Sequence, residues 1–161
     1  MGSAGHRLFI ILATATLVLD QATKAAATAW LQPRGAIEVI PGFFDLAYVL
    51  NRGAVFGMFR GLQDPYRGLL LTIVPLVALV VVLAMVVRTP AARLRTHAAL
   101  GLILGGAVGN LLDRLRLGAV VDFLEFYVGR YHWPNFNAAD SAICIGVGLL
   151  VIDIWRTTPD R

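Results

Sequence analysis

The chain has 161 residues, of which 58% are hydrophobic and 15% are charged, and its formal net charge at pH 7 is +4. Soluble domains carry about 25% charged residues, so this composition indicates a small polytopic membrane protein. The positive charge is too small and too scattered to suggest a nucleic-acid partner. The single cysteine, Cys144, excludes an internal disulfide bond and a cysteine-based metal site.

The first apolar segment follows a short basic N-terminus and continues past Lys24. Basic charge, a short apolar run and small residues fit a cleavable signal peptide. Residues 8–28, however, are long enough to cross a bilayer, so we expect a first transmembrane helix there. Asp20 precedes Lys24 by four residues, the favourable order for a helical ion pair. An interfacial pair reaching toward water is the simpler alternative.

Residues 29–66 form the longest segment that does not span the membrane. From Phe44 to Asn51 every second residue is large and apolar, a pattern typical of a β-strand. We expect a small extracytoplasmic sheet over residues 36–57, lying on the outer membrane surface with Asn51 directed at the functional site. The alternative is a turn that only closes a hairpin.

Three further apolar segments, over residues 69–87, 96–112 and 138–155, complete the arrangement. Each is apolar enough to be read as a transmembrane helix. The sequence therefore predicts an all-α membrane protein with four transmembrane helices and a small extracytoplasmic β-cradle. A short helix or loop is expected between the third and fourth helices. The whole chain, residues 1–161, forms a single polytopic domain in this interpretation.

The third expected helix contains glycines at regular spacing, at Gly101, Gly105, Gly106 and Gly109. Small residues four apart let helices approach closely, and close packing is the structural explanation for them. The functional alternative is a groove, open to the bilayer, that would form wherever no helix packs against this surface.

Basic residues with almost no accompanying acid lie on one side of the four expected helices. The two longer links also carry basic residues, but more sparsely and balanced by acids. Residues 1–7, 88–96 and 156–161 hold six Lys or Arg residues and one acid, Asp160. The positive-inside rule then places both termini in the cytoplasm. That orientation brings four polar residues of interest to the outer face: Asp20, Asn51, Asp122 and Asp140.

Acidic residues beside membrane-spanning sequence are costly, and function is the default explanation for them. The stretch from Asn110 to Ser141 holds four of the ten acidic residues. The best candidates are Asp122, in VVDF, and Asp140, in FNAADS. Asn137 is a predicted helix N-cap, which puts Asp140 at the third helical position. A first-turn acid facing the helix dipole is the simpler interpretation of Asp140.

Two carboxylates that share one proton suit peptide hydrolysis, because like charges a few ångströms apart cannot both ionise freely. One acts as a base toward water while the other donates its proton to the carbonyl oxygen. Gly129 and Pro134 separate Asp122 from Asp140, so the two cannot belong to one continuous helix. The intervening segment can still fold one toward the other. We predict that Asp122 and Asp140 are the catalytic pair of a membrane aspartyl protease.

A second polar group lies at the end of the third expected helix. Asn110, Asp113 and Arg114 share one face there, because they are three and four residues apart. An Asp–Arg pair alone could be simple solvation of the helix end, but the accompanying asparagine favours a hydrogen-bonded cluster.

Other chemistries are less well supported. Ser141 with Lys24 could form a Ser–Lys dyad, but Ser141 more simply hydrogen-bonds the first helical turn. Cys144 lies in an apolar helix and is expected to be an inert buried thiol. A proton-coupled transporter or channel would favour acids deep in the spans rather than at helix ends. The histidines show no metal-ligand spacing: His6, His97 and His132.

Five motifs, in order along nearly the whole chain, resemble those of the lipoprotein signal peptidase family, also called signal peptidase II, a family of bacterial membrane aspartyl proteases. They are DQATK at Asp20–Lys24, NRGAVFG at Asn51–Gly57, GGAVGNLLDR at Gly105–Arg114, VVDF at Val120–Phe123 and FNAADS at Phe136–Ser141. Val55 stands where alanine is commoner, with no functional consequence expected. No catalytic position departs from the pattern.

The resemblance implies a four-helix fold with an outer β-cradle, and chemistry without a metal or cofactor. It implies cleavage of a prolipoprotein signal peptide before a diacylglyceryl-modified, and so lipidated, cysteine. Membrane lipid is the other implied partner, and the implied location is the outer face of the bacterial cytoplasmic (inner) membrane. Asp122 and Asp140 match the catalytic positions. The residues implied to bind substrate or support the site are Asp20, Lys24, Asn51, Asn110, Arg114 and Asn137.

Overall fold

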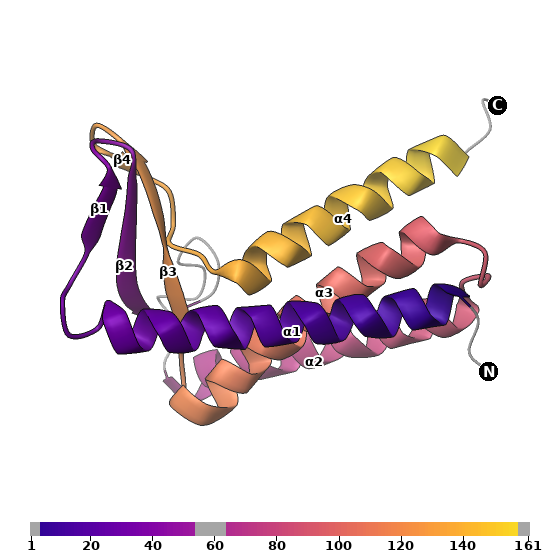
Figure 1. Ribbon diagram of the computed structural model, residues 1–161. Helices are drawn as coiled ribbons and strands as arrows, with labels where there is room; N and C mark the ends of the chain where they lie inside the picture. The colour runs from indigo at the N-terminus through magenta and orange to yellow at the C-terminus, as the bar shows by residue number, and fades with distance from the viewer. Residues whose placement is uncertain (1–3, 54–63, 158–161) are drawn as a thin grey trace.

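The computed structural model describes residues 4–53 and 64–157. They form four helices, α1 (Ala4–Trp30), α2 (Asp64–Arg88), α3 (Leu94–Leu117) and α4 (Ala138–Thr157). The four strands are β1 (Ile37–Ile40), β2 (Phe44–Asn51), β3 (Val120–Val128) and β4 (Tyr131–His132). The sheet stands at one end of the helices, while α1 begins and α4 ends at the opposite end (Figure 1). The C-terminal end of the range predicted to form the sheet, residues 54–57, lies outside the described residues.

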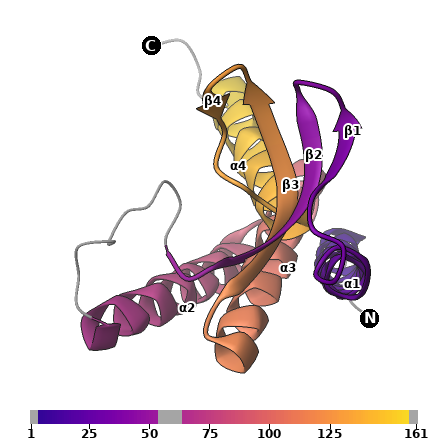
Figure 2. The same cartoon turned by 90° about the vertical axis from the view of Figure 1, so that its left-hand side faces the viewer.

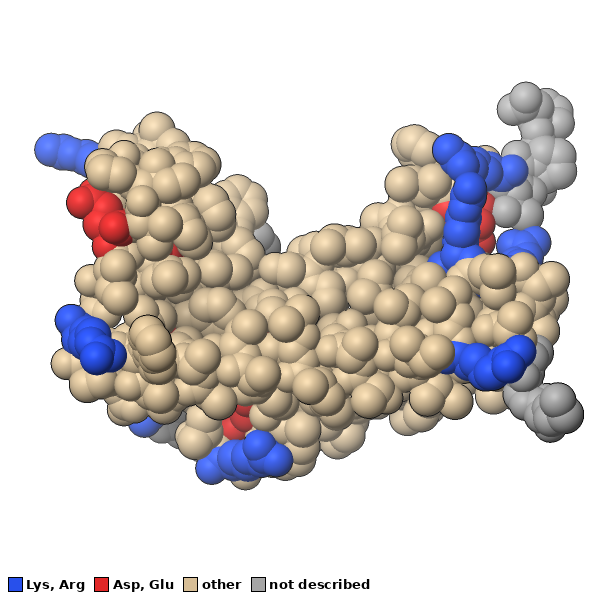
Figure 3. All heavy atoms as spheres, viewed as in Figure 1, with Lys and Arg blue, Asp and Glu red and all other residues tan. Residues whose placement is uncertain are grey.

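Three of these helices are long and apolar enough to cross a membrane: Ala4–Trp30, Leu94–Leu117 and Ala138–Arg156. The described part of α2 contributes a shorter apolar stretch, Ile73–Arg88. On the face drawn in Figure 3, charged side chains lie toward the two ends of the molecule and an uncharged surface covers the helices between them. This distribution is what a bilayer requires, because charged side chains near its centre are costly.

Helix α3 is the centre of the helical layer and packs against α1, α4 and α2. Its glycines make this possible: a Cβ on Gly105 would lie 2.5 Å from the carbonyl oxygen of Ala13 in α1. A Cβ on Gly106 would lie 2.5 Å from the carbonyl oxygen of Ala139 in α4. The close-packing explanation of these glycines is therefore correct. The lipid-facing groove along them is wrong, because α1 and α4 cover that surface.

The sheet has the order β1-β2-β3-β4, and each neighbouring pair is antiparallel. Strand β3 occupies the region between α3 and α4, so the expected short helix or loop there is wrong. Val120–Val128 is rich in β-branched and aromatic residues, and it pairs with β2 through contacts such as Val49 with Asp122. This pairing with a distant strand stabilises β3, and the local sequence of residues 120–128 does not show it.

Helix α3 also runs beyond residue 112, where the sequence placed its end, and stops at Leu117. Gly118 follows in the left-handed conformation, at φ 66°, and its N–H bonds the carbonyl oxygen of Arg114 at 2.9 Å. This glycine cap turns the chain directly into β3. Asp113 and Arg114 therefore lie on the helix and face the junction between helices and sheet.

A small apolar cluster fixes the sheet to the end of α1. Its buried members are Ala27, Leu31 and Phe123, and Leu46 and Leu124 pack around them. Phe123 directly follows Asp122, so this contact also determines where Asp122 lies. Packing of apolar neighbours thus orients a strand that carries a polar side chain.

Candidate active site

Asp122 is a buried carboxylate on β3. This strand contacts α1 and α3 and lies near the start of α4 (Figure 2). Asp122 is only 1% exposed. Asn51, at the end of β2, donates from Nδ2 to Asp122 Oδ2 at 2.8 Å. Asn137 donates from Nδ2 to Asp122 Oδ1 at 2.7 Å. Both oxygens are therefore held by neutral amides.

Asp140 lies in the first turn of α4 and is partly buried. Asn110 of α3 donates from Nδ2 to Asp140 Oδ1 at 2.8 Å. Asn137 caps the helix, because its Oδ1 accepts the Asp140 N–H at 3.0 Å and its own N–H bonds Asp140 Oδ2 at 3.3 Å. This reciprocal pattern is a capping box, and the predicted N-cap is confirmed.

Asn137 contacts both aspartates, one through its side chain and the other through its backbone. It is fully buried, and its Nδ2 also lies 3.2 Å from Asn110 Oδ1. Because a single residue links Asp122 to Asp140, the two carboxylates belong to one hydrogen-bonded cluster. Strand β3 contributes one of them and helix α4 contributes the other.

A buried ion cluster is joined to Asp140 through Asn110. Lys24 Nζ is 2.9 Å from Asp20 Oδ2 and 2.9 Å from Asp113 Oδ2. It also donates to Asn110 Oδ1 at 2.9 Å, so its positive charge reaches Asp140 through one amide. The predicted Asp20–Lys24 pair is confirmed, and the interfacial alternative is wrong because the two side chains are 0% and 4% exposed.

Two residues of this cluster were not among the predicted site residues. Asp113 was expected near Asn110, and the signal that could have marked it was its position three residues later on the same helix face. Gln21 donates from Nε2 to Asp113 Oδ1 at 3.1 Å and to Asp20 Oδ2 at 3.2 Å. Only its place within the DQATK motif distinguished Gln21 in the sequence.

Arg114 lies on the same end of α3 and is partly buried. Its guanidinium bonds the carbonyl oxygen of Asn110 at 3.4 Å. Its charge attracts the carboxylates of Asp140, Asp122 and Asp113, in decreasing order. All eight predicted site residues thus lie in one region, and Arg114 provides a positive charge at its edge.

Comparison with known proteins identifies the family. Residues 12–156 match the family described as signal peptidase (SPase) II. The chain belongs to the signal peptidase II family. It is 46% identical over 156 residues to the lipoprotein signal peptidase of Syntrophus aciditrophicus, covering 96% of each chain. It is 42% identical over 156 residues to that of Syntrophotalea carbinolica, covering 97% of this chain and 96% of the relative.

Two solved structures share the fold of this chain. Both are described as bacterial membrane enzymes, determined by the in meso method, and each gives a TM-score of 0.80. One is 29% identical and covers 95% of this chain and 93% of its own. The other is 30% identical and covers 93% and 94% respectively. With its apolar helices, this signal peptidase II is a multi-pass membrane protein.

Burial governs the protonation of Asp122 in this signal peptidase II. Desolvation raises the pKa of Asp122 to about 7, against the lowering effect of the hydrogen bond from Asn51. The nearby charge of Asp140 raises it further, and Asn137 and Lys24 lower it. At neutral pH Asp122 therefore exists in both protonated and ionised forms.

The geometry contradicts the alternative of a Ser141–Lys24 catalytic dyad. Ser141 Oγ donates to the carbonyl oxygen of Asn137 at 3.0 Å, as a first-turn residue is expected to do. Lys24 directs its ammonium to Asp20, Asp113 and Asn110, which accounts for all three of its donors. Cys144 is exposed, so the expectation of a buried thiol is wrong. Its side chain points outward from the apolar helix α4.

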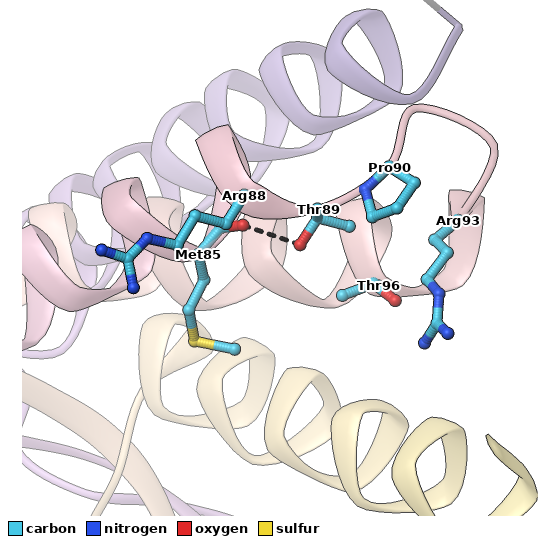
Figure 4. Close-up of a pocket in the computed structure, with 6 residues that line it drawn as sticks. All are labelled: Met85, Arg88, Thr89, Pro90, Arg93 and Thr96. Atoms are coloured by element: carbon cyan, nitrogen blue, oxygen red, sulfur yellow. Dashed lines mark hydrogen bonds between the residues drawn. The ribbon is translucent and has the colours of Figure 1, made fainter.

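A cavity of about 270 Å³ lies between α2 and α3, at the end of the helices opposite the sheet. It is lined by Met85, Arg88, Thr89, Pro90, Arg93 and Thr96. The guanidinium groups of Arg88 and Arg93 point in different directions and do not converge on one ligand (Figure 4). The cavity is separate from the cluster around Asp122 and Asp140.

Proposed function

We propose that Asp122 and Asp140 form the catalytic pair with which this signal peptidase II cleaves prolipoproteins. The chain is an aspartic endopeptidase of the membrane that removes the signal peptide from prolipoproteins. In our proposal the scissile bond precedes a diacylglyceryl-modified cysteine. The observation that carries the dyad is the double contact of Asn137, at 2.7 Å to Asp122 and 3.3 Å to Asp140.

The pair hydrolyses the peptide by sharing one proton. The ionised carboxylate takes a proton from water, which attacks the scissile carbonyl carbon, while the protonated carboxyl donates to the carbonyl oxygen. Collapse of the tetrahedral intermediate then requires a proton on the departing nitrogen, which the carboxyl that took the proton from water returns. The raised pKa of Asp122, about 7, supports retention of the shared proton at neutral pH.

The remaining polar residues support the pair or bind substrate. Asn51, Asn110 and Asn137 hold the carboxylate oxygens with neutral donors, which leaves the pair free to exchange its proton. Asp20 and Lys24 form a buried ion pair that supports the site. Arg114, at the edge, is placed by its charge to bind a backbone carbonyl or the ester of an approaching substrate.

Membrane orientation follows from charge. We infer four transmembrane helices, with α2 as the fourth span, and both termini in the cytoplasm. Arg88, Arg93 and Arg156 at the end opposite the sheet support this orientation under the positive-inside rule. The dyad then lies at the outer face of the bacterial cytoplasmic membrane, where water is accessible and a lipid-anchored substrate arrives from the bilayer. Prolipoprotein and membrane lipid are the partners, with no role for nucleic acid.

The direct test is cleavage of a lipidated precursor peptide by the purified protein in vesicles. Mass spectrometry should find a fragment that begins at the modified cysteine. A chelator should leave the rate unchanged, because the proposed chemistry uses no metal. Cleavage at another bond, or loss of activity on chelation, would refute the proposed reaction.

We expect Asn51→Ala to move the upper limb of the kcat–pH profile to higher pH. Asn51 lowers the pKa of Asp122 by donating to its ionised form, so its removal raises that pKa above about 7. The pair then keeps its shared proton to higher pH. The maximal kcat should fall about tenfold, because Asp122 loses one orienting contact. The measurement is kcat between about pH 5 and pH 9.

The matched control is Gln32→Ala, which removes an exposed amide from the turn after α1. Its profile should coincide with that of the unmodified protein. An upper limb that stays in place in Asn51→Ala, or moves to lower pH, would show that Asn51 does not tune Asp122.

A further inference from the structure

Two buried carboxylates outside the dyad each accept a backbone N–H. In each case the N–H belongs to the residue directly before a dyad aspartate. Asp113 Oδ2 accepts the N–H of Val121, the residue before Asp122, at 3.1 Å. Asp20 Oδ1 accepts the N–H of Ala139, the residue before Asp140, at 3.0 Å. Each contact joins a helix side chain to the element that carries the aspartate.

The two anchoring carboxylates are themselves joined by bridging groups. Lys24 Nζ lies 2.9 Å from an oxygen of each. Gln21 Nε2 donates to Asp20 at 3.2 Å and to Asp113 at 3.1 Å. A continuous polar path therefore runs from the backbone of β3, through Asp113, Lys24 and Asp20, to the backbone of α4.

We propose that Asp113 is a positioning residue, which fixes the separation of Asp122 and Asp140 by anchoring the Val121 N–H to the Lys24–Asp20 pair. This inference rests on the proposed function, because the separation matters only if the two aspartates act together. Proton sharing requires the carboxylates to be held close, and small displacements of reacting groups cost large factors in rate. Asp113 itself does not touch the substrate.

Charge balance makes this proposal testable without unfolding the protein. The cluster contains two acids and one base, so removal of Asp113 leaves the Asp20–Lys24 pair intact. Removal of Lys24 would instead leave two acids facing each other without a counter-charge, which is the costly case for buried ions. Variants of Asp113 should therefore fold and report on geometry.

The experiment compares Asp113→Asn and Asp113→Ala on the lipidated precursor in vesicles. Asparagine keeps an acceptor for the Val121 N–H but loses the charge, whereas alanine loses both. We expect kcat to fall about tenfold in Asp113→Asn and about a hundredfold in Asp113→Ala, with KM within about threefold of its original value. The partial rescue by asparagine separates backbone anchoring from charge pairing alone.

Asp153→Asn is the matched control, because it changes the same residue type at the far end of α4. Asp153 accepts a hydrogen bond from Thr96 at 2.6 Å, away from the dyad. Its kcat should be unchanged. Equal kcat losses in Asp113→Asn and Asp113→Ala, or a kcat within about threefold of the original in Asp113→Ala, would overturn the inference.

A second variant tests the same contact with Asp113 in place, and it decides the question if Asp113→Ala loses its folded yield. Replacing Val121 by its α-hydroxy acid turns the N–H into an ester oxygen and leaves every side chain in place. We expect about a tenfold fall in kcat, and no further fall when the ester is combined with Asp113→Asn. An ester variant with full activity would overturn the inference. Failure of the unmodified protein to cleave the precursor would instead refute the proposed function.

Discussion

Asp122→Asn and Asp140→Asn should each lower kcat on the lipidated precursor by about 10³-fold or more, with the protein still folded and inserted in the membrane. Each amide keeps the shape of the carboxyl group but cannot relay a proton between water and the peptide. The measurement is single-turnover cleavage by purified variants, together with thermal unfolding in the same detergent. Substantial turnover by either variant would remove the dyad.

Two neighbouring substitutions are the controls for the dyad. Cys144→Ala alters an exposed side chain of α4, and Ser141→Ala removes only the hydrogen bond to the Asn137 carbonyl oxygen. Both should retain activity near that of the unmodified protein. Loss of chemistry with normal folding in Ser141→Ala would restore the serine alternative.

A precursor with an unmodified cysteine should be cleaved about a hundredfold more slowly than the lipidated form, even in the same vesicles. Asp140 lies in the first turn of α4, at the end of an apolar helix long enough to cross the bilayer. Two acyl chains on the substrate cysteine would hold the scissile bond at that depth, with each buried methylene contributing about 0.8 kcal/mol relative to water. Depth and orientation, rather than extra affinity, then account for the rate.

The acyl chains cannot lie along the glycines of α3, because α1 and α4 cover that surface. Val147 and Val151 are exposed apolar side chains on the same face of α4 as Asp140, and they offer an alternative surface. The test compares kcat/KM for both precursors at equal membrane concentration. Equal values would contradict recognition of the lipid and favour a general signal-peptide hydrolase.

Local pattern was sufficient for several features of this protein. Long apolar blocks predicted helices, alternation from Phe44 to Asn51 predicted β2, and Asn137 was expected to cap the helix that carries Asp140. The Asp20–Lys24 pair followed from a spacing of four residues. These features depend on neighbours within one turn of helix or a few residues of strand, so the sequence alone determines them.

Other features required partners far away in the chain. Strand β3 exists because it pairs with β2, and Asn51 meets Asp122 across 71 positions. The exposure of Cys144 depended on which face of α4 contacts α3, and the apolar sequence of α4 does not distinguish its faces.

The anchoring role of Asp113 also belongs to the tertiary structure. Its carboxylate joins the Val121 N–H to Lys24, on another helix, and sequence spacing predicted only its proximity to Asn110. Buried polar groups must find partners wherever the fold supplies them, and those partners need not be neighbours in sequence. The sequence therefore determined which carboxylates to consider, whereas packing of α1, α3, α4 and the sheet decided how they are joined.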